Sequence, residues 1–126
     1  MEPVILCYEK CTTCKKALKW VEETGIAVKI RPIKEENPSA EELKQWHQKS
    51  GLPLKRFFNT SGNLYKELKL KDRLPQMSEE QQYQILSTDG MLVKRPLLVT
   101  GNGVCPGFQQ EQWEKLLNVY TGGRKD

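Results

Sequence analysis

The stretch that decides the fold is VILCYEKCTTC, residues 4–14. It opens with five mostly apolar residues that Glu9 and Lys10 end, which predicts a short strand buried on both faces. The CTTC after it places two cysteines, Cys11 and Cys14, where this strand gives way to a helix. A pair of thiols with this spacing at such a junction indicates a reactive dithiol rather than two unrelated core residues.

A helix and a second strand are predicted directly after the dithiol. Apolar residues recur at helical spacing over residues 12–24, and Gly25 supplies a C-terminal stop. Ile26, Val28 and Ile30 then alternate with less apolar residues, which is typical of a strand. The chain therefore opens as strand, helix, strand.

A block of short helices is expected over residues 39–88. Ser39 and Ser78 each stand three residues before a Glu or Gln, which is the capping-box spacing of a helix start. Between these two helices, short helical segments are predicted around residues 54–58 and 64–68. This block separates the opening unit from the last third of the chain.

That last third returns to strands. Residues 91–99 are expected to form one strand of a hairpin, Gly101–Gly103 its tight turn, and Val104 with Cys105 the second strand. An amphipathic helix from Phe108 to Tyr120 closes the chain. The order predicts an α/β fold: a thioredoxin-like mixed sheet with a helical insertion, forming one domain over residues 1–126.

Composition places the chain among soluble domains of a reducing compartment. Its 126 residues carry 20 basic and 16 acidic side chains, interspersed rather than blocked. The opening residues lack the pattern of a signal peptide or membrane span, so a cytoplasmic location is expected. Spread charge without an aromatic platform argues against direct nucleic-acid binding, and a monomer is expected. In a reducing compartment the four cysteines are not expected to form permanent bridges.

The two thiols of the dithiol are predicted to play different roles. Cys11 stands beside the unpaired backbone amides of a helix N-terminus, and Lys10, Lys15 and Lys16 add positive charge nearby. This environment favours its thiolate, whereas Cys14, one turn on and more buried, is expected to keep an ordinary pKa. Cys11 is therefore predicted to attack and Cys14 to resolve.

The cysteines also have alternative interpretations. An inert dithiol is one alternative, and Cys7 in the first strand is interpreted as a small apolar core residue. Cys105 either packs or acts as a third thiol, and packing is favoured. A closed zinc site requires four ligands, usually as a second close pair, and the chain has no such pair. His47, the one histidine, is interpreted as a packing residue, so no metal site is predicted.

Arg95-Pro96 is the second feature that bears on the geometry of the dithiol site. An X-Pro bond at the start of a strand can be cis and bring backbone close to a dithiol loop. An edge-strand proline beside a surface arginine is the plainer interpretation. In combination with the dithiol, the cis form is preferred.

Three motifs resemble the ArsC/Spx family: CTTCKKA at residues 11–17, NPS at 37–39 and GMLVKRP at 90–96. The resemblance covers nearly the whole chain. It implies a thioredoxin-like fold with a helical insertion. Members of that family include glutaredoxin-linked arsenate reductases, the RNA-polymerase-binding regulator Spx and many uncharacterised reductase-like proteins.

The resemblance also carries residue roles. In the arsenate reductases a cysteine matching Cys11 attacks arsenate, and three arginines hold the oxyanion. Arg95 matches one of these, whereas Asn59 and Phe108 stand at the other two positions, so the cradle is largely missing. A resolving Cys14 removes the need for glutathione to complete the cycle.

These features together predict a reductase-like thiol–disulfide redox protein that holds no cofactor and is reset by thioredoxin, glutaredoxin or glutathione. Two alternatives stay open: an Spx-like redox-sensing regulator that binds RNA polymerase, and an arsenate reductase with an altered oxyanion site. A relative whose thiols have no catalytic use is the plainest alternative. The predicted catalytic residues are Cys11 and Cys14, and the predicted substrate-binding residues are Thr12, Thr13, Arg95 and Pro96.

Overall fold

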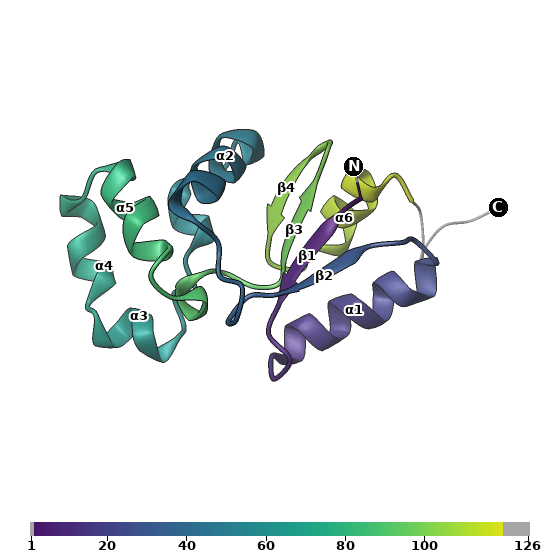
Figure 1. The fold of residues 1–126 in the computed structure, drawn as a ribbon, viewed down its shortest axis with the longest axis horizontal. Helices are drawn as coiled ribbons and strands as arrows, with labels where there is room; N and C mark the ends of the chain where they lie inside the picture. The colour runs from purple at the N-terminus through teal and green to yellow at the C-terminus, as the bar shows by residue number, and fades with distance from the viewer. Residues whose placement is uncertain (1, 120–126) are drawn as a thin grey trace. The chain divides into compact units, whose positions relative to one another are not determined.

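The computed structural model describes residues 2–119, which belong to two compact units (Figure 1). Among the described residues, the sheet unit consists of residues 2–31 and 95–119, and the helical unit of residues 32–94. The predicted helical insertion, residues 39–88, falls within the helical unit. Tyr120, expected in the last helix, lies outside the described residues.

The sheet unit has the predicted order of elements, strand-helix-strand followed by strand-strand-helix. Its strands lie side by side in the order β2-β1-β3-β4, and both β1–β3 and β3–β4 are antiparallel. The helix between β1 and β2 is the kind of crossover that neighbouring parallel strands need. The elements are β1 Val4–Cys7, α1 Thr12–Thr24, β2 Lys29–Pro32, β3 Leu97–Thr100, β4 Gly103–Pro106 and α6 Gln110–Leu117.

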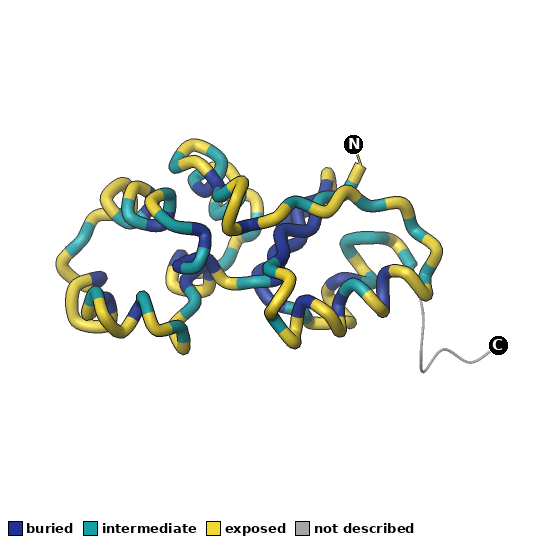
Figure 2. Tube along the Cα trace, turned by 60° about the horizontal axis from the view of Figure 1, so that its bottom comes forward, coloured by how far each residue is buried: buried dark blue, intermediate teal, exposed yellow. Residues whose placement is uncertain are grey.

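The core of the sheet unit lies between one face of the sheet and two helices. Ile5, Leu98 and Cys105 are register partners on three neighbouring strands and point into one buried cluster. Trp20 from α1 and Trp113 from α6 join this cluster with ring centroids 6.4 Å apart, so both helices cover the same face. Figure 2 shows these central strands as dark blue, buried chain. Burial of such large apolar side chains is the main stabilising term of the unit.

Helix α1 begins and ends at the predicted residues. Cys11 is its N-cap, and Gly25 is its C-cap with φ of 77°. This left-handed conformation suits glycine because it has no Cβ to collide with the preceding turn. The dithiol therefore stands at the first turn of a helix whose two ends are defined by the sequence.

The second strand differs from its prediction. β2 begins only at Lys29, after Ile26 and Val28, and the side chain of Ile30 within it is 46% exposed. β2 is the edge strand of the sheet, with β1 as its neighbour. The alternation of apolar and polar residues in this segment therefore does not correspond to one buried and one exposed face. Val28 lies before the strand and packs at the margin of the core cluster.

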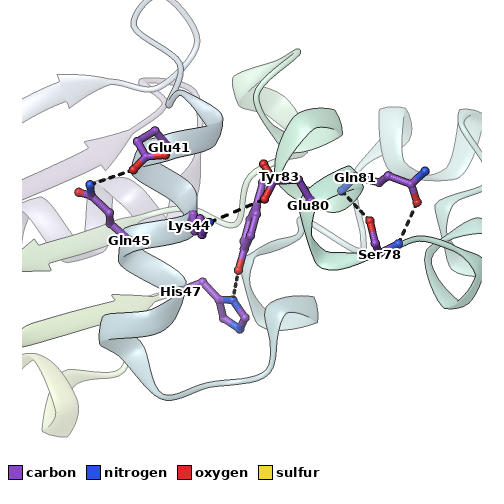
Figure 3. Close-up of polar contacts among 8 residues, drawn as sticks. All are labelled: Glu41, Lys44, Gln45, His47, Ser78, Glu80, Gln81 and Tyr83. Carbon is purple, nitrogen blue, oxygen red and sulfur yellow. Dashed lines mark hydrogen bonds and ion pairs between the residues drawn. The ribbon is translucent and has the colours of Figure 1, made fainter.

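The helical unit contains both predicted capping boxes. Ser39 Oγ accepts the Glu42 N–H at 3.1 Å, and Glu42 Oε1 accepts the Ser39 N–H at 3.0 Å. Ser78 and Gln81 repeat this exchange at 3.1 and 2.9 Å (Figure 3). The elements are α2 Ala40–Ser50, η1 Leu54–Phe57, α3 Asn63–Glu67, α4 Leu70–Arg73, η2 Leu74–Gln76, α5 Glu79–Leu86 and η3 Gly90–Leu92.

The prediction of a strand from residue 91 is wrong, because residues 90–92 form the 3-10 turn η3. The Asp89 carboxylate accepts the Met91 N–H at 2.8 Å and starts this turn. Gly90 lies so close to the backbone carbonyl of Ile33 that a Cβ has no room. Val93 makes an isolated bridge to Phe58, and strand β3 begins four residues later.

Candidate functional site

Cys11 occupies the junction between β1 and α1 as predicted. It is half-buried, with an extended backbone (φ −88°, ψ 120°). Its sulfur accepts the backbone N–H of Cys14 at 3.4 Å, and its own N–H donates to the Tyr8 carbonyl at 3.0 Å. The thiol thus takes the place of a capping side chain and lies at the positive end of α1.

Cys14 lies one turn further along α1 and is 1% exposed. Its sulfur accepts the Tyr8 N–H at 3.4 Å. A hydrogen bond from the Cys7 thiol lowers the pKa of Cys14 to about 6, helped by the Tyr8 N–H, Cys11 and the charge of Arg95, and opposed by burial. The prediction that Cys14 keeps an ordinary pKa is therefore wrong. The donors gather on the inner sulfur because it faces the end of β1.

Cys7, at the end of β1, is buried in the core cluster as predicted. Sequence reasoning missed its contact with Cys14, although strand alternation puts Cys7 on the same face as Ile5, toward α1. The hydrogen bond to Cys14, followed by burial, raises the pKa of the Cys7 thiol. Cys7 is thus the protonated partner of the pair.

Cys105 packs in the same core cluster. Its sulfur lies 3.6 Å from the Gly107 carbonyl and 3.9 Å from the Pro106 carbonyl, so its S–H points to its own loop. All four cysteines are free thiols in this structure. This environment agrees with the packing role that the sequence favours.

The loop before β3 brings Arg95 and Pro96 into the sheet unit. The Arg95–Pro96 peptide bond is cis, as preferred from the sequence. The Arg95 guanidinium lies over the Tyr8 ring, 5.2 Å from its centroid, and its charge reaches Cys14. Pro96 is buried, and its carbonyl accepts the Gly107 N–H at 2.8 Å. Arginine and thiols therefore meet at the same end of the sheet.

The two threonines between the cysteines are both exposed. Thr12 and Thr13 form the first turn of α1, beside the half-buried Cys11 sulfur. They stand at a helix N-terminus, where anionic groups are favoured.

The sequence model of the ArsC family matches residues 6–116 of this chain. The chain belongs to the ArsC family. The matched segment runs through both units and includes both cysteines of the dithiol as well as Arg95 and Pro96.

Several relatives resemble this ArsC-family chain over most of its length. It is 53% identical to the uncharacterized protein YusI of Bacillus subtilis over 86% of this chain and 92% of that one. An ArsC family related protein of Bacteroides fragilis is 54% identical, with a TM-score of 0.89 and coverage of 92% and 98%. An arsenate reductase of Vibrio cholerae is 29% identical, with a TM-score of 0.77 and coverage of 95% and 98%.

A regulator is also among the relatives. The global transcriptional regulator Spx of Listeria innocua is 25% identical over 108 residues, which span 85% of this chain and 80% of that one. This chain, with its thioredoxin-like α/β fold, is thus similar both to an arsenate reductase and to a transcriptional regulator.

The two positions where the family resemblance implies further arginines hold structural residues. Phe108 packs on Trp113 and Trp20, with ring centroids 5.0 and 5.8 Å apart. In the helical unit, Asn59 Nδ2 donates to the Met91 carbonyl at 3.4 Å, and the Asn59 N–H donates to the Leu92 carbonyl at 2.8 Å. Neither side chain carries charge for an oxyanion.

His47 serves packing inside the helical unit. Its Nδ1 lies 2.6 Å from the Tyr83 hydroxyl (Figure 3). Its ring also meets Phe57 edge-on, with ring centroids 5.9 Å apart. Across residues 2–119, His, Cys, Asp and Glu side chains form no group of three that would hold a metal ion. The same residues contain no helix that is long and apolar enough to cross a membrane.

Proposed function

We propose that this ArsC-family protein is a thiol-dependent oxidoreductase in which Cys11 is the nucleophile and Cys14 the resolving thiol. The observation that carries the proposal is the asymmetry of the pair. Cys11 is half-buried at the N-cap of α1, whereas Cys14 is 1% exposed and its pKa is lowered to about 6. An accessible sulfur meets the substrate, and an ionised inner sulfur is ready to displace it.

The reaction proceeds in two exchanges. The Cys11 thiolate attacks one sulfur of a substrate disulfide, forms a mixed disulfide and releases the other sulfur as a thiolate. The Cys14 thiolate then attacks the Cys11 sulfur, forms the Cys11–Cys14 disulfide and releases the second substrate thiolate. The substrate gains two electrons, the dithiol loses two, and the released thiolates take protons from solvent.

The surrounding groups recognise the substrate. Arg95, whose charge reaches Cys14, orients an anionic group of the substrate, and the backbone around Pro96 pairs with an incoming chain. Thr12 and Thr13 complete the rim beside Cys11. Thioredoxin, glutaredoxin or glutathione returns the two electrons. We place this cycle in the cytoplasm, where such donors keep thiols reduced.

Turnover with a small disulfide, driven by thioredoxin or by glutathione as donor, tests the proposal. Cys11→Ser is expected to abolish turnover, and Cys14→Ser to stop at a stable mixed disulfide. Cys105→Ser is the matched control, because Cys105 packs against its own loop. Full activity of the Cys11→Ser variant would overturn the mechanism.

Arsenate is expected to be a poor substrate. The charge that would hold this oxyanion is reduced to Arg95, since Asn59 hydrogen-bonds to the Met91 carbonyl and Phe108 packs on Trp113. Reduced protein incubated with arsenate should therefore keep its free thiols, whereas a small disulfide should oxidise them. Stoichiometric thiol loss with arsenate would instead support an arsenate reductase with an altered oxyanion site.

A redox-controlled regulator is the second candidate. It is favoured by the similarity to Spx over 85% of the chain, together with the dithiol at a helix terminus. Oxidation of the pair would change a surface rather than a substrate. Capture of RNA polymerase by the protein in one redox state alone, lost in Cys11→Ser, would support this role. Equal capture, or none, in both states would argue against it.

A further inference from the structure

One buried thiol near the site takes part in no step of this cycle. Cys7 ends β1, is 5% exposed and belongs to the core cluster that also contains Cys14. A cysteine in such a place normally counts as a small apolar residue. The next residue along the chain, Tyr8, donates its backbone N–H to Cys14 Sγ at 3.4 Å, and the Cys7 and Cys14 side chains share the same buried cluster, where they form a hydrogen-bonded pair.

We propose that Cys7 is a positioning residue of the dithiol: its S–H donates a hydrogen bond to Cys14 Sγ and holds that sulfur as a thiolate aimed for resolution. This inference rests on the proposed roles of Cys11 and Cys14. It adds a third thiol that stays reduced throughout the cycle. Cys7 acts through Cys14 and touches no substrate.

The direction of the hydrogen bond follows from the surroundings of the two sulfurs. Cys14 Sγ already accepts the Tyr8 N–H at 3.4 Å and feels the charge of Arg95, so negative charge is stabilised there. Cys7 lies on the sheet side, in a row with apolar Ile5, where burial penalises a thiolate. Cys7 therefore keeps the proton and donates it.

The end of β1 thus supplies two consecutive donors to one sulfur. The Cys7 side chain and the Tyr8 backbone N–H both meet Cys14 Sγ, while the N–H of Cys14 points to Cys11. The donors hold the inner sulfur on the strand side, where the first turn of α1 places Cys11 next to it. Removal of Cys7 takes away one of the two donors without touching Cys11.

Loss of this hydrogen bond has a redox consequence. Groups that stabilise a thiolate stabilise the reduced dithiol and raise its reduction potential. A hydrogen bond from a weak thiol donor to a charged acceptor is expected to shift the thiolate equilibrium about tenfold. The same tenfold change in the redox equilibrium corresponds to about 30 mV for this two-electron couple.

The test compares alanine and serine at position 7. Serine keeps a donor and alanine removes it, whereas a purely apolar role would make alanine the better substitute. In a Cys11→Ser, Cys105→Ser background, thiolate absorbance against pH reports the ionisation of Cys14. The reduction potential is measured in parallel with Cys11 and Cys14 both present.

Cys7→Ala is expected to raise the ionisation midpoint of Cys14 by about one pH unit and to lower the potential by about 30 mV. Cys7→Ser should recover part of both shifts. Unchanged values in Cys7→Ala, or equal shifts in both variants, would overturn the proposal. If Cys7→Ala does not fold, Cys7→Val removes the donor while filling the space, and the same comparison with serine applies.

The titration also separates the role of Cys7 from the proposed function. It needs no substrate, so a Cys14 midpoint that responds to Cys7 stands even if turnover does not depend on Cys11. The converse result is turnover that depends on Cys11 together with an ionisation midpoint of Cys14 that is the same with and without Cys7. That result would support the proposed function and contradict the role of Cys7.

Discussion

The two units of the molecule are specified in different ways. The helical unit is built from short segments with local signals, such as the reciprocal hydrogen bonds of Ser39 and Ser78 at two helix starts. The sheet unit depends on contacts between residues far apart in sequence, such as Trp20 with Trp113. All four cysteines lie in the sheet unit. The chemistry is therefore placed where tertiary packing, rather than local sequence, fixes the geometry.

The largest loss of stability is expected in the core of the sheet unit. Trp113 is fully buried, and its Nε1–H donates to the Gly107 carbonyl at 3.0 Å. Trp113→Ala should lower the free energy of unfolding by about 3–5 kcal/mol, because it leaves a cavity and removes the indole hydrogen bond to the Gly107 carbonyl. Urea denaturation measures the loss, with the exposed neighbour Gln112→Ala as control within about 0.5 kcal/mol. A loss below about 1 kcal/mol would contradict this role of core packing.

The dithiol makes the stability of the reduced protein depend on pH. The pKa of Cys14 is lowered from 9.0 to about 6, so the folded state binds fewer protons than the unfolded state between these values. The free energy of unfolding should rise from pH 6 to pH 9, by an amount on the order of 3 kcal/mol. This stabilising contribution is lost as the pH falls to about 6, the pKa of Cys14 in the folded state.

Cys14→Ser is the control for this pH dependence. Denaturation of the reduced wild-type protein and of this variant at several pH values gives the comparison. The rise should be absent from the variant. A wild-type profile as flat as that of the variant would show that Cys14 is not ionised at neutral pH.

In the helical unit the costliest change is expected at a backbone contact. A Cβ at Gly90 would collide with the Ile33 carbonyl, and a backbone atom cannot step aside as a flexible side chain does. Gly90→Ala should therefore cost about 2 kcal/mol of stability. Gly101→Ala is the matched control, because nothing lies near its added Cβ, and it should change stability by less than about 0.5 kcal/mol. Equal effects in both variants, measured by thermal or urea unfolding, would be inconsistent with this close approach.

The smallest effects are expected at the helix caps. Ser39→Ala and Ser78→Ala should each cost about 1 kcal/mol, since each leaves one N–H of the first helical turn without its side-chain acceptor. The exposed Ser61 offers the control, and Ser61→Ala should be neutral in the same unfolding assay. Cap variants as costly as Trp113→Ala would remove the contrast between the two units.

The same contrast explains which features the sequence predicts and which it misses. Gly25 and both serine caps are local signals, and the structure confirms each of them. Val28 and Met91 are wrongly assigned to strands, because the start of an edge strand and the close approach of Gly90 to Ile33 depend on tertiary contacts. Neither feature is written in the local pattern.

In the candidate site too, features with local sequence signals are predicted, and features that depend on tertiary contacts are not. The junction at Cys11 and the cis bond before Pro96 are anticipated from short motifs. The hydrogen bond between Cys7 and Cys14 is not, because the two side chains come from a strand and a helix that meet only after folding. Spacing identifies the dithiol, but only the packed core reveals which sulfur receives the donors.

The different roles of the two dithiol sulfurs can be read out in one experiment. One equivalent of glutathione disulfide is added to reduced wild-type protein and to Cys14→Ser, and the modified cysteines are identified by peptide mass mapping. If Cys11 attacks and Cys14 resolves, the wild type will contain a Cys11–Cys14 disulfide and the variant will carry glutathione on Cys11. Glutathione on Cys7 or Cys105, or no Cys11–Cys14 bond in the wild type, would contradict these roles.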